Sequence, residues 1–301
     1  MKVKELLAYG RDNLIDKEEP YRLSKILLKH VMKVDDSYFV VHENDEVEEE
    51  IVQEFRDGIK QLNEGQPLQY ITHHQEFMKL DFYVDENVLI PQPDTEILVE
   101  EIINTHKNGD TGPGFMPAQG VGADDSVRPV PQRNTTILDL CTGSGAIGIA
   151  LAHNLSNAKV TLTDVSKEAL AIAKKNAIQN GVERQCTFIE SDMFQNITGE
   201  YDVIASNPPY IKTDVIPTLD KEVQNEPTIA LDGGIDGLTF YKIIANEAHK
   251  YLKPNGTLAL EIGYDQKEDV IKLLENTGMY TNIQCIQDLS GNDRVVICNK
   301  K

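Results

Sequence analysis

The chain of 301 residues predicts an α/β protein: a mostly parallel sheet with an antiparallel C-terminal strand, preceded by a small helical domain. Two patterns predict this fold. Apolar residues recur at helical spacing through the N-terminal region, and from residue 135 onward short β-branched segments alternate with helical ones. We therefore expect a helical domain at 1–66, a β-hairpin linker at 67–93 and an α/β domain at 94–301.

The N-terminal region is expected to contain three helical segments. Pro20 stands where the second would begin, because proline is favoured at the first helical position. The third runs from about Glu48 to Leu62 with one apolar face. The acidic stretch Glu43–Glu50 suits the start of that helix, where the helix dipole favours negative charge. We interpret this stretch as a solvated face and assign it no function.

The linker region differs in composition from the helical segments. Aromatic and β-branched residues between Leu68 and Leu89 favour a strand or hairpin that joins the two domains. After Pro91-Gln92-Pro93, either Asp94 or Thr95 is expected to cap the next helix.

A long segment at residues 107–134 interrupts the α/β domain. It contains five glycines and four prolines without apolar periodicity. A connection of this length is unusual inside a compact domain. A binding lid is one interpretation, but the composition favours a flexible insert.

From Thr135 the pattern alternates between strand and helix. The expected strands are 137–140, 160–164, 187–189, 203–205, 258–260, 280–286 and 294–298. The expected helices are 146–153 and 167–180, with two more around 243–248 and 270–274. The turn Ser290-Gly291-Asn292 separates the last two strands, so they should form an antiparallel hairpin on an otherwise parallel sheet.

Charge and cysteine content exclude several classes of protein. The formal net charge of −20 is spread over both halves of the chain, which disfavours a nucleic-acid-binding protein because phosphate groups would be repelled. The four cysteines have no spacing suited to zinc, so no metal is expected. The first residues do not form a signal peptide, and no apolar run is long enough to span a membrane. We expect a cytoplasmic protein with reduced thiols and no membrane partner.

A glycine-rich turn follows the first expected strand. Gly143 and Gly145 can adopt positive φ and let a ligand approach the backbone closely. Residues 143–148 also satisfy the pattern GxGxxG, although Gly148 is equally explained by close packing of helix on sheet. A turn of this kind is a weak signal by itself and does not identify the ligand.

Two carboxylates follow the next two strands. Asp164 lies about twenty residues beyond the turn, where an acidic residue bonds ribose hydroxyls. Asp192 follows the third strand, where a carboxylate can accept a hydrogen bond from an adenine amino group. Each could instead cap a helix, but Ser166 already suits the cap beside Asp164. The pair indicates an adenosyl ligand and leaves both NAD and S-adenosylmethionine open.

The tetrapeptide Asn207-Pro208-Pro209-Tyr210 closes the fourth strand, at the crevice where open α/β sheets bind ligands. The two prolines fix φ twice and leave carbonyl oxygens as their only backbone hydrogen-bonding groups. With the side-chain acceptor of Asn207 they form a rigid cup for an –NH2 group, and Tyr210 offers a face to a planar group. In isolation an extended turn would be the preferred interpretation, but the place after the fourth strand makes the motif strongly specific.

These residues carry a resemblance to a known family. The chain resembles the S-adenosylmethionine-dependent methyltransferases that modify planar amino groups and carry an Asn/Asp-Pro-Pro-Tyr/Phe motif. More closely, it resembles the release factor glutamine methyltransferases over nearly its whole length. The similar segments besides the tetrapeptide are Pro67–Ile71, Glu76-Phe77, Leu89–Pro91, Pro93–Glu96, Cys141–Gly145, Glu226-Pro227, Asp232–Gly234, Asp236–Leu238, Glu261–Gly263, Asp288–Gly291 and Asp293–Val296.

The resemblance implies a class I methyltransferase with a Rossmann-like sheet and with S-adenosyl-L-methionine as cofactor. It implies methyl transfer to the side-chain amide nitrogen (N5) of the glutamine in the Gly-Gly-Gln motif of peptide chain release factors. The helical domain would dock this protein substrate, and a monomer is expected. The implied cofactor-binding residues are Cys141, Thr142, Gly143, Ser144, Gly145, Asp164, Asp192, Met193 and Asn207. The implied catalytic and substrate-binding residues are Asn207, Pro208, Pro209 and Tyr210.

The implied chemistry depends on positioning, because an amide nitrogen is a poor nucleophile. Asn207 Oδ1 and the Pro208 carbonyl would accept the two amide hydrogens and stabilise the positive charge that develops on nitrogen.

Three positions depart from the family's pattern. Gln92 replaces an arginine, His73 replaces a glycine, and Met193 stands where an aromatic residue is often found beside adenine.

Three alternatives remain at this stage. A glutamine methyltransferase of a ribosomal protein would share the motif. An adenine or guanine amino methyltransferase acting on nucleic acid carries a similar motif, but the net charge of −20 opposes it. A binding module that only retains the fold is disfavoured by the intact tetrapeptide and by Asp164.

Overall fold

The computed structural model describes residues 1–106 and 134–301. The described residues form two compact units, and the expected insert at 107–134 lies outside them except for Asn134. The first unit comprises Met1–His74 together with Leu219–Glu226, and the second comprises the remainder. The unit boundary at His74 therefore falls inside the expected linker at 67–93.

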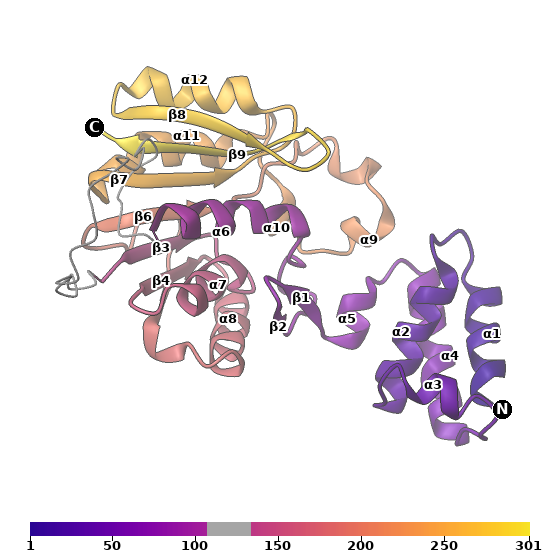
Figure 1. Ribbon diagram of the computed structural model, residues 1–301. Coiled ribbons are helices and arrows are strands. Elements are labelled where there is room, and N and C mark those ends of the chain that lie inside the picture. The colour runs from indigo at the N-terminus through magenta and orange to yellow at the C-terminus, as the bar shows by residue number, and fades with distance from the viewer. Residues whose placement is uncertain (107–133) are drawn as a thin grey trace, which may run out of the picture. The chain divides into compact units, whose positions relative to one another are not determined.

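The first unit is helical, as predicted. Its helices are α1 (Val3–Asn13), α2 (Pro20–Met32), α3 (Tyr38–Val41), α4 (Glu49–Asn63), α5 (Leu68–Thr72) and the short α9 (Lys221–Gln224) (Figure 1). They enclose an apolar core in which Leu6, Leu27 and Phe55 are fully buried. Helices α1 and α2 approach closely at Gly10, where a Cβ atom would lie 2.2 Å from Ser24 Oγ.

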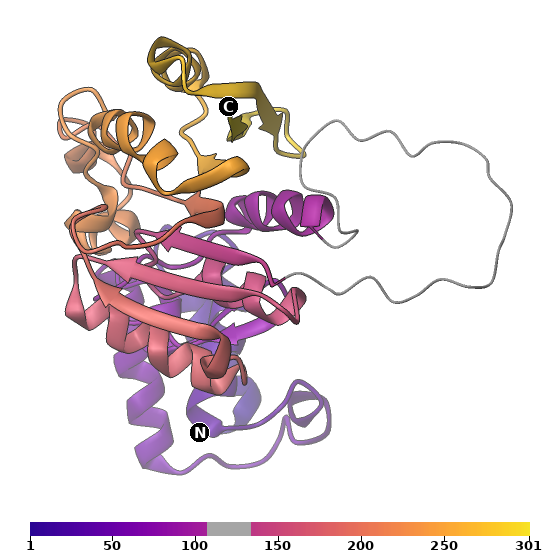
Figure 2. The same ribbon diagram turned by 90° about the vertical axis from the view of Figure 1, so that its left-hand side faces the viewer.

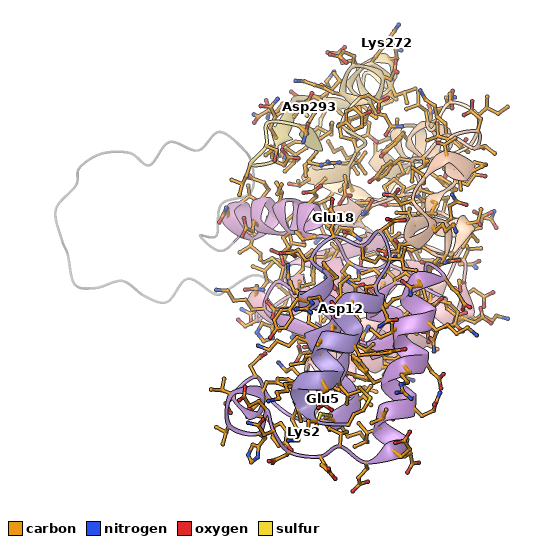
Figure 3. The ribbon with its side chains drawn as sticks, turned by 90° about the vertical axis from the view of Figure 1, so that its right-hand side faces the viewer. Lys2, Glu5, Asp12, Glu18, Lys272 and Asp293 are labelled. Carbon is orange, nitrogen blue, oxygen red and sulfur yellow. The ribbon has the colours of Figure 1, made fainter. Side chains whose placement is uncertain are left out.

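Charged side chains cover the outside of this helical unit. Figure 3 labels Glu5, Asp12 and Glu18, all three of which are exposed. Glu5 also accepts a hydrogen bond of 2.9 Å from the backbone nitrogen of Lys2, at the positive end of α1. The labelled acidic side chains of the helical unit therefore lie on its solvent-exposed surface.

Helix α5 is a correction to the sequence-based expectation of a strand from Leu68. The segment is helical because burial of Leu68 and Tyr70 outweighs their strand propensity. The helix ends at His73, whose φ of 52° lies in the left-handed region. The family that the chain resembles has glycine at this position, and glycine adopts such a φ without strain.

Residues 219–226 join the helical unit although they follow the tetrapeptide in the sequence, which was not foreseen. Asn225 Nδ2 donates a hydrogen bond of 2.8 Å to the Gly65 carbonyl oxygen. The ammonium group of Lys17 pairs with the Glu222 carboxylate. A side chain at Gly65, whose φ is 95°, would meet Lys221 Cβ at 2.8 Å. These contacts attach the segment to the helical unit.

The second unit contains the expected hairpin and the expected sheet. Strands β1 (Gln75–Phe77) and β2 (Leu80–Phe82) form the hairpin, and seven strands form the sheet in the order β5-β4-β3-β6-β7-β9-β8. Strand β9 runs antiparallel to both of its neighbours, β7 and β8, while the other paired strands of the sheet are parallel, which confirms the predicted fold class (Figure 2). The strands of the sheet are β3 (Thr136–Leu140), β4 (Lys159–Asp164), β5 (Cys186–Glu190), β6 (Tyr201–Ser206), β7 (Leu252–Glu261), β8 (Tyr280–Gln287) and β9 (Asp293–Lys300).

Helices cover both faces of this sheet (Figure 1). On one face α6 (Pro93–His106), α7 (Ala146–Asn154) and α8 (Lys167–Gln179) share an apolar core with the strands. On the other face α11 (Thr239–Glu247) and α12 (Lys267–Thr277) build a second core. The shorter elements are α10 (Thr228–Leu231) and the 3-10 turns Glu183–Gln185, Ile216–Thr218 and Ala248–Lys250. Among the described residues, no helix is both long enough and apolar enough to cross a membrane.

The start of α6 corrects a second expectation. The helix begins at Pro93, whose fixed φ suits a first helical residue, so neither Asp94 nor Thr95 is its cap. Both side chains instead take part in tertiary contacts. Asp94 pairs with Arg294 on β9 at 3.0 Å, and Thr95 accepts a hydrogen bond from Asn207.

Candidate functional site

A cavity opens at the carboxyl ends of the central strands, within the second unit. Strand β3 pairs with β4 on one side and with β6 on the other, so the loops that leave these strands diverge and form a crevice. The empty volume of the cavity, which includes space open to solvent, is about 970 Å³. Of the predicted site residues, those that line it are Cys141, Thr142, Gly143, Ser144, Asp164, Asp192, Met193, Asn207 and Pro209. Gly145, Pro208 and Tyr210 are not among the lining residues.

The glycine-rich turn forms one wall of the cavity. Gly143 and Gly145 have φ of 53° and 86°, as their sequence pattern predicts. A Cβ atom at Gly145 would lie 2.6 Å from Ile149 Cδ1, so this glycine permits close packing rather than ligand contact. Gly148 has a similar role, because its Cβ atom would lie 2.8 Å from the carboxylate of Asp139.

Asp139, which sequence reasoning did not place in the site, holds this turn together. Its Oδ2 accepts hydrogen bonds from Thr142 Oγ1 at 2.5 Å and from Gly148 N at 2.8 Å. Burial raises the pKa of Asp139 to about 7 in spite of these two donors. A signal was present in the sequence: an acidic residue inside an apolar strand has to be buried, and buried carboxylates need donors.

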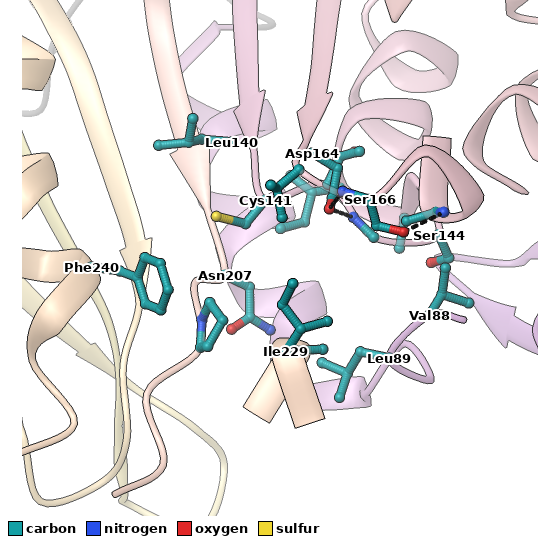
Figure 4. Close-up of a pocket in the computed structure, with 18 of the residues that line it drawn as sticks. Val88, Leu89, Leu140, Cys141, Ser144, Asp164, Ser166, Asn207, Ile229 and Phe240 are labelled. Carbon is teal, nitrogen blue, oxygen red and sulfur yellow. Dashed lines mark hydrogen bonds between the residues drawn. The ribbon is translucent and has the colours of Figure 1, made fainter. Parts of the chain in front are cut away.

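Asp164 lies at the end of β4, where its carboxylate lines the cavity (Figure 4). Oδ2 accepts from Gly143 N and Oδ1 accepts from Ser166 N, each at 2.9 Å. Burial raises the pKa of this carboxyl, and the backbone donors counteract the rise. Ser166 Oγ accepts from Ala169 N at 3.1 Å, so Ser166 is the helix cap, as predicted. Each Asp164 oxygen retains acceptor capacity for the hydroxyl of a ligand.

Asp192 and Met193 follow β5 and form the next part of the wall. Met193 is buried with a φ of 49°, and its sulfur lies 3.9 Å from that of Cys141. Asp192 is exposed and accepts a hydrogen bond from Gln195 Nε2 at 3.1 Å. No helix of the described chain begins at Asp192, so a capping role does not explain it. An apolar surface beside an accessible carboxylate suits an aromatic ring that carries an amino group.

Asn207 lies directly after β6 and reaches the cavity with its side chain (Figure 4). Its Nδ2 donates to Thr95 Oγ1 at 3.3 Å. Within the described part of the chain, Oδ1 has no hydrogen-bond partner and remains available as an acceptor. The site therefore presents a carbonyl-type oxygen with one fixed orientation to a ligand.

The chain matches two family models, the methyltransferase small domain over residues 126–234 and the PrmC N-terminal domain over residues 5–72. It is 35% identical over 308 residues to a release factor glutamine methyltransferase of Clostridium acetobutylicum, covering 99% of this chain and 98% of that protein. The chain belongs to the release factor glutamine methyltransferase family. The relative of the same name from Agrobacterium fabrum is 40% identical over 239 residues, with 79% and 76% of the two chains covered.

A solved structure with low sequence identity has a similar fold. The catalytic domain of hMettl16, solved in complex with a 3′UTR hairpin, superposes with a TM-score of 0.53 and 15% sequence identity. The match covers 74% of this chain and 76% of that one. At this identity the similarity establishes the class I methyltransferase fold alone.

Contacts to the backbone hold the tetrapeptide of this family member and the residue after it in place. The Tyr210 carbonyl accepts from Gln266 Nε2 at 3.0 Å, and Ile211 bridges to Asp232. A Cβ atom at Gly233 would lie 2.7 Å from Tyr210 Cα, so glycine is required for this approach. Tyr210 is partly buried and packs against the apolar core that contains Tyr241 of α11. The aromatic side chain among the described lining residues is instead Phe240 (Figure 4).

Several other lining residues of the methyltransferase site were not foreseen. They are apolar side chains from segments far apart in the sequence: Val88, Leu89, Ile147, Ile229 and Phe240. Gln92, which departs from the family's arginine, also lines the cavity and donates from Nε2 to the Ile90 carbonyl at 3.2 Å. Nothing in the spacing of these residues distinguishes them from ordinary core positions. Among the described residues, no cluster of side chains is suited to a metal ion.

Proposed function

We propose that this protein transfers the methyl group of S-adenosylmethionine to the side-chain amide nitrogen of the glutamine in the Gly-Gly-Gln motif of peptide chain release factors. Family membership supports the reaction class. The observation that carries the proposal concerns Asn207, whose Nδ2 donates to Thr95 and whose side chain lines the cavity, so that Oδ1 is the acceptor it can offer to a ligand. An acceptor held in this way selects a substrate –NH2 group.

We propose that the cavity binds S-adenosylmethionine, which supplies an electrophilic methyl group on a sulfonium sulfur. Asp164 offers its carboxylate to the ribose hydroxyls, beside the backbone of Gly143. Asp192 offers an acceptor to the adenine amino group, and Met193 and Ile147 offer apolar contact to the ring. The remaining residues proposed for cofactor binding are Cys141, Thr142 and Ser144, which line the cavity, and Gly145, whose close packing against Ile149 shapes the turn that carries them.

The amide of the substrate would be positioned by the tetrapeptide. Asn207 Oδ1 and the Pro208 carbonyl accept the two amide hydrogens, which directs the nitrogen lone pair toward the methyl group. The same two oxygens stabilise the positive charge that develops on the nitrogen during transfer. Pro209 lines the cavity beside Asn207 and limits the space open to the glutamine side chain. We propose that Tyr210 contributes through its backbone, whose carbonyl Gln266 holds in place.

We further propose that the helical unit docks the release factor. The unit has its own apolar core, and it holds residues 219–226, which follow the tetrapeptide in the sequence after residues 211–218. Asn225→Ala removes the hydrogen bond to Gly65 and should raise KM for the release factor without changing cofactor affinity. Asn246→Ala is the matched control, because Asn246 donates to the Lys242 carbonyl within α11, and this hydrogen bond lies in the second unit. Equal KM values for the two variants would contradict this docking role.

Intact-mass analysis tests the proposed reaction directly. A release factor incubated with the enzyme and S-adenosylmethionine should gain the mass of one methyl group, and peptide mapping should place it on the Gly-Gly-Gln glutamine. A mass gain on another residue, or none, would refute the proposal. A ribosomal protein incubated in parallel should remain unmodified.

A further inference from the structure

Glu261 ends strand β7 beside the tetrapeptide, and no role in the site has been assigned to it. Strands β6 and β7 are parallel neighbours with Ser206 opposite Leu260, so Asn207 and Glu261 leave the sheet next to each other. Glu261 is 2% exposed. Its Oε2 is buried without a hydrogen-bond partner in the described part of the chain. An unsatisfied buried carboxylate oxygen costs stability, so its presence calls for an explanation.

The neighbours of this carboxyl group come from three elements of the fold. They are the Thr95 hydroxyl of α6, the Arg294 guanidinium of β9 and the Asn207 amide. Arg294 is itself paired with the Asp94 carboxylate at 3.0 Å, so its charge is shared. Burial raises the pKa of Glu261 to about 7, while Thr95, Arg294 and Asn207 hold it down. The carboxyl is thus kept close to ionisation at neutral pH without an ion pair of its own.

The direction of the hydrogen bonds follows from what each group can donate. Asn207 Nδ2 donates to Thr95 Oγ1 at 3.3 Å, so the hydroxyl hydrogen of Thr95 must point elsewhere. An ionised Glu261 can only accept, so the Thr95 hydroxyl and the Asn207 amide, which both stabilise its charge, are the donors on that side. Asp94 is a second acidic neighbour. We propose that Glu261 is a positioning residue: through the Thr95 hydroxyl it fixes the Asn207 carboxamide with Oδ1 toward the cavity.

The alternative arrangement shows why an acceptor is needed at Glu261. If the Thr95 hydroxyl donated to Asn207 instead, the carboxamide would turn over and place its –NH2 group toward the ligand. Two –NH2 groups facing each other cannot hydrogen-bond, so the amide of a glutamine substrate would lose its acceptor. This inference rests on the proposed function, since it assigns Glu261 and Thr95 to the orientation of the acceptor for that amide.

Substitutions at both positions test the proposal. Glu261→Gln introduces a donor in place of the carboxylate, and Thr95→Val removes the hydroxyl at nearly constant shape. Both should lower the single-turnover rate on the order of tenfold or more, with S-adenosylmethionine affinity unchanged. Thr95→Ser, which restores the hydroxyl, should recover most of the rate. Thr257→Val is the matched control, because this substitution removes a buried hydroxyl from the same strand β7. The Thr257→Val variant should transfer the methyl group at the wild-type rate.

A second readout does not depend on turnover. In the wild-type protein the Asn207 Nδ2 hydrogens should exchange slowly with solvent by NMR, and both Glu261→Gln and Thr95→Val should accelerate their exchange. Wild-type rates and exchange in Glu261→Gln would overturn the positioning role, as would loss of rate in Thr95→Ser equal to that in Thr95→Val. Failure of the proposed function is distinguishable, because the wild-type protein would then transfer no methyl group while the exchange differences persisted.

Discussion

The substitution Asp164→Ala separates the binding role of this carboxylate from its structural role. In the structure the carboxylate accepts from two backbone nitrogens, those of Gly143 and Ser166, each at 2.9 Å. It also faces the cavity, where the ribose of S-adenosylmethionine would add a charge-assisted hydrogen bond. A bond of this kind contributes about 1.5–3 kcal/mol. The dissociation constant should therefore rise by roughly ten- to a hundredfold.

The same substitution should also lower the stability of the protein. Two partly buried N–H groups lose their acceptor, and an unsatisfied group costs about 1–3 kcal/mol. Part of this loss is offset because burial raises the pKa of Asp164, which shows that its ionised form is unfavourable in this position. We expect a net destabilisation of about 1–3 kcal/mol in chemical denaturation.

Isothermal calorimetry with S-adenosylmethionine measures the first effect, at a temperature at which the variant is folded. Asp202→Ala is the control for a loss of stability alone. Asp202 accepts from Thr136 N at 2.8 Å and pairs with Lys253 at 2.7 Å, at the opposite end of the strands from the cavity. Unchanged affinity in Asp164→Ala would remove this residue from the site. An equal loss in Asp202→Ala would show that the effect is not local.

Three further predictions follow from the same geometry. Asn207→Ala should lower turnover by about a hundredfold or more and cofactor affinity much less, because one preorganised acceptor is lost; a full single-turnover rate would contradict its aiming role. Gly145→Ala should destabilise the protein by about 1–3 kcal/mol in urea denaturation, since its Cβ atom would lie 2.6 Å from Ile149 Cδ1 at a φ of 86°, whereas wild-type stability would show that the turn adjusts freely. Burial raises the pKa of Glu261 from 4.5 to about 7, so between these pH values the folded protein keeps a proton on Glu261 that the unfolded chain has released. Its stabilising contribution is present below pH 4.5 and is lost as the pH rises through about 7. Glu261→Gln should remove this part of the pH dependence of the unfolding free energy, and an unchanged pH profile would place the titration elsewhere.

The fold could be predicted where the local pattern and the tertiary environment agree. The strands of the sheet are short apolar runs between helical segments, and the turn Ser290-Gly291-Asn292 marks the terminal hairpin. The expectation of a strand was wrong at Leu68–Thr72, because Leu68 and Tyr70 are buried on a helix and Leu68 packs into the core of the helical unit. It was also not possible to assign residues 219–226 to the helical unit, since the contacts that attach them, such as Asn225 with Gly65 and Glu222 with Lys17, join residues far apart in the sequence.

The candidate site was predictable as far as it depends on strand ends. Asp164, Asp192 and Asn207 gather at one cavity because parallel strands bring their carboxyl ends to the same edge of the sheet. Lining residues such as Phe240 come from the opposite layer and have no sequence signal of their own. The contact of Thr95 with Asn207 could not be predicted either, because it joins residues 112 positions apart. Its polar side chain at a helix start suggested a cap instead.

The account predicts a protein glutamine as the methyl acceptor, and the most direct measurement follows where a labelled methyl group goes. Labelled S-adenosylmethionine is supplied with a release factor, with its Gly-Gly-Gln glutamine→alanine variant, with duplex DNA and with ribosomal RNA, at low salt where electrostatic binding to nucleic acid is strongest. Label should enter the release factor alone, because the net charge of −20 disfavours contact with phosphate groups. Label in either nucleic acid, or label that persists in the alanine variant, would contradict the account.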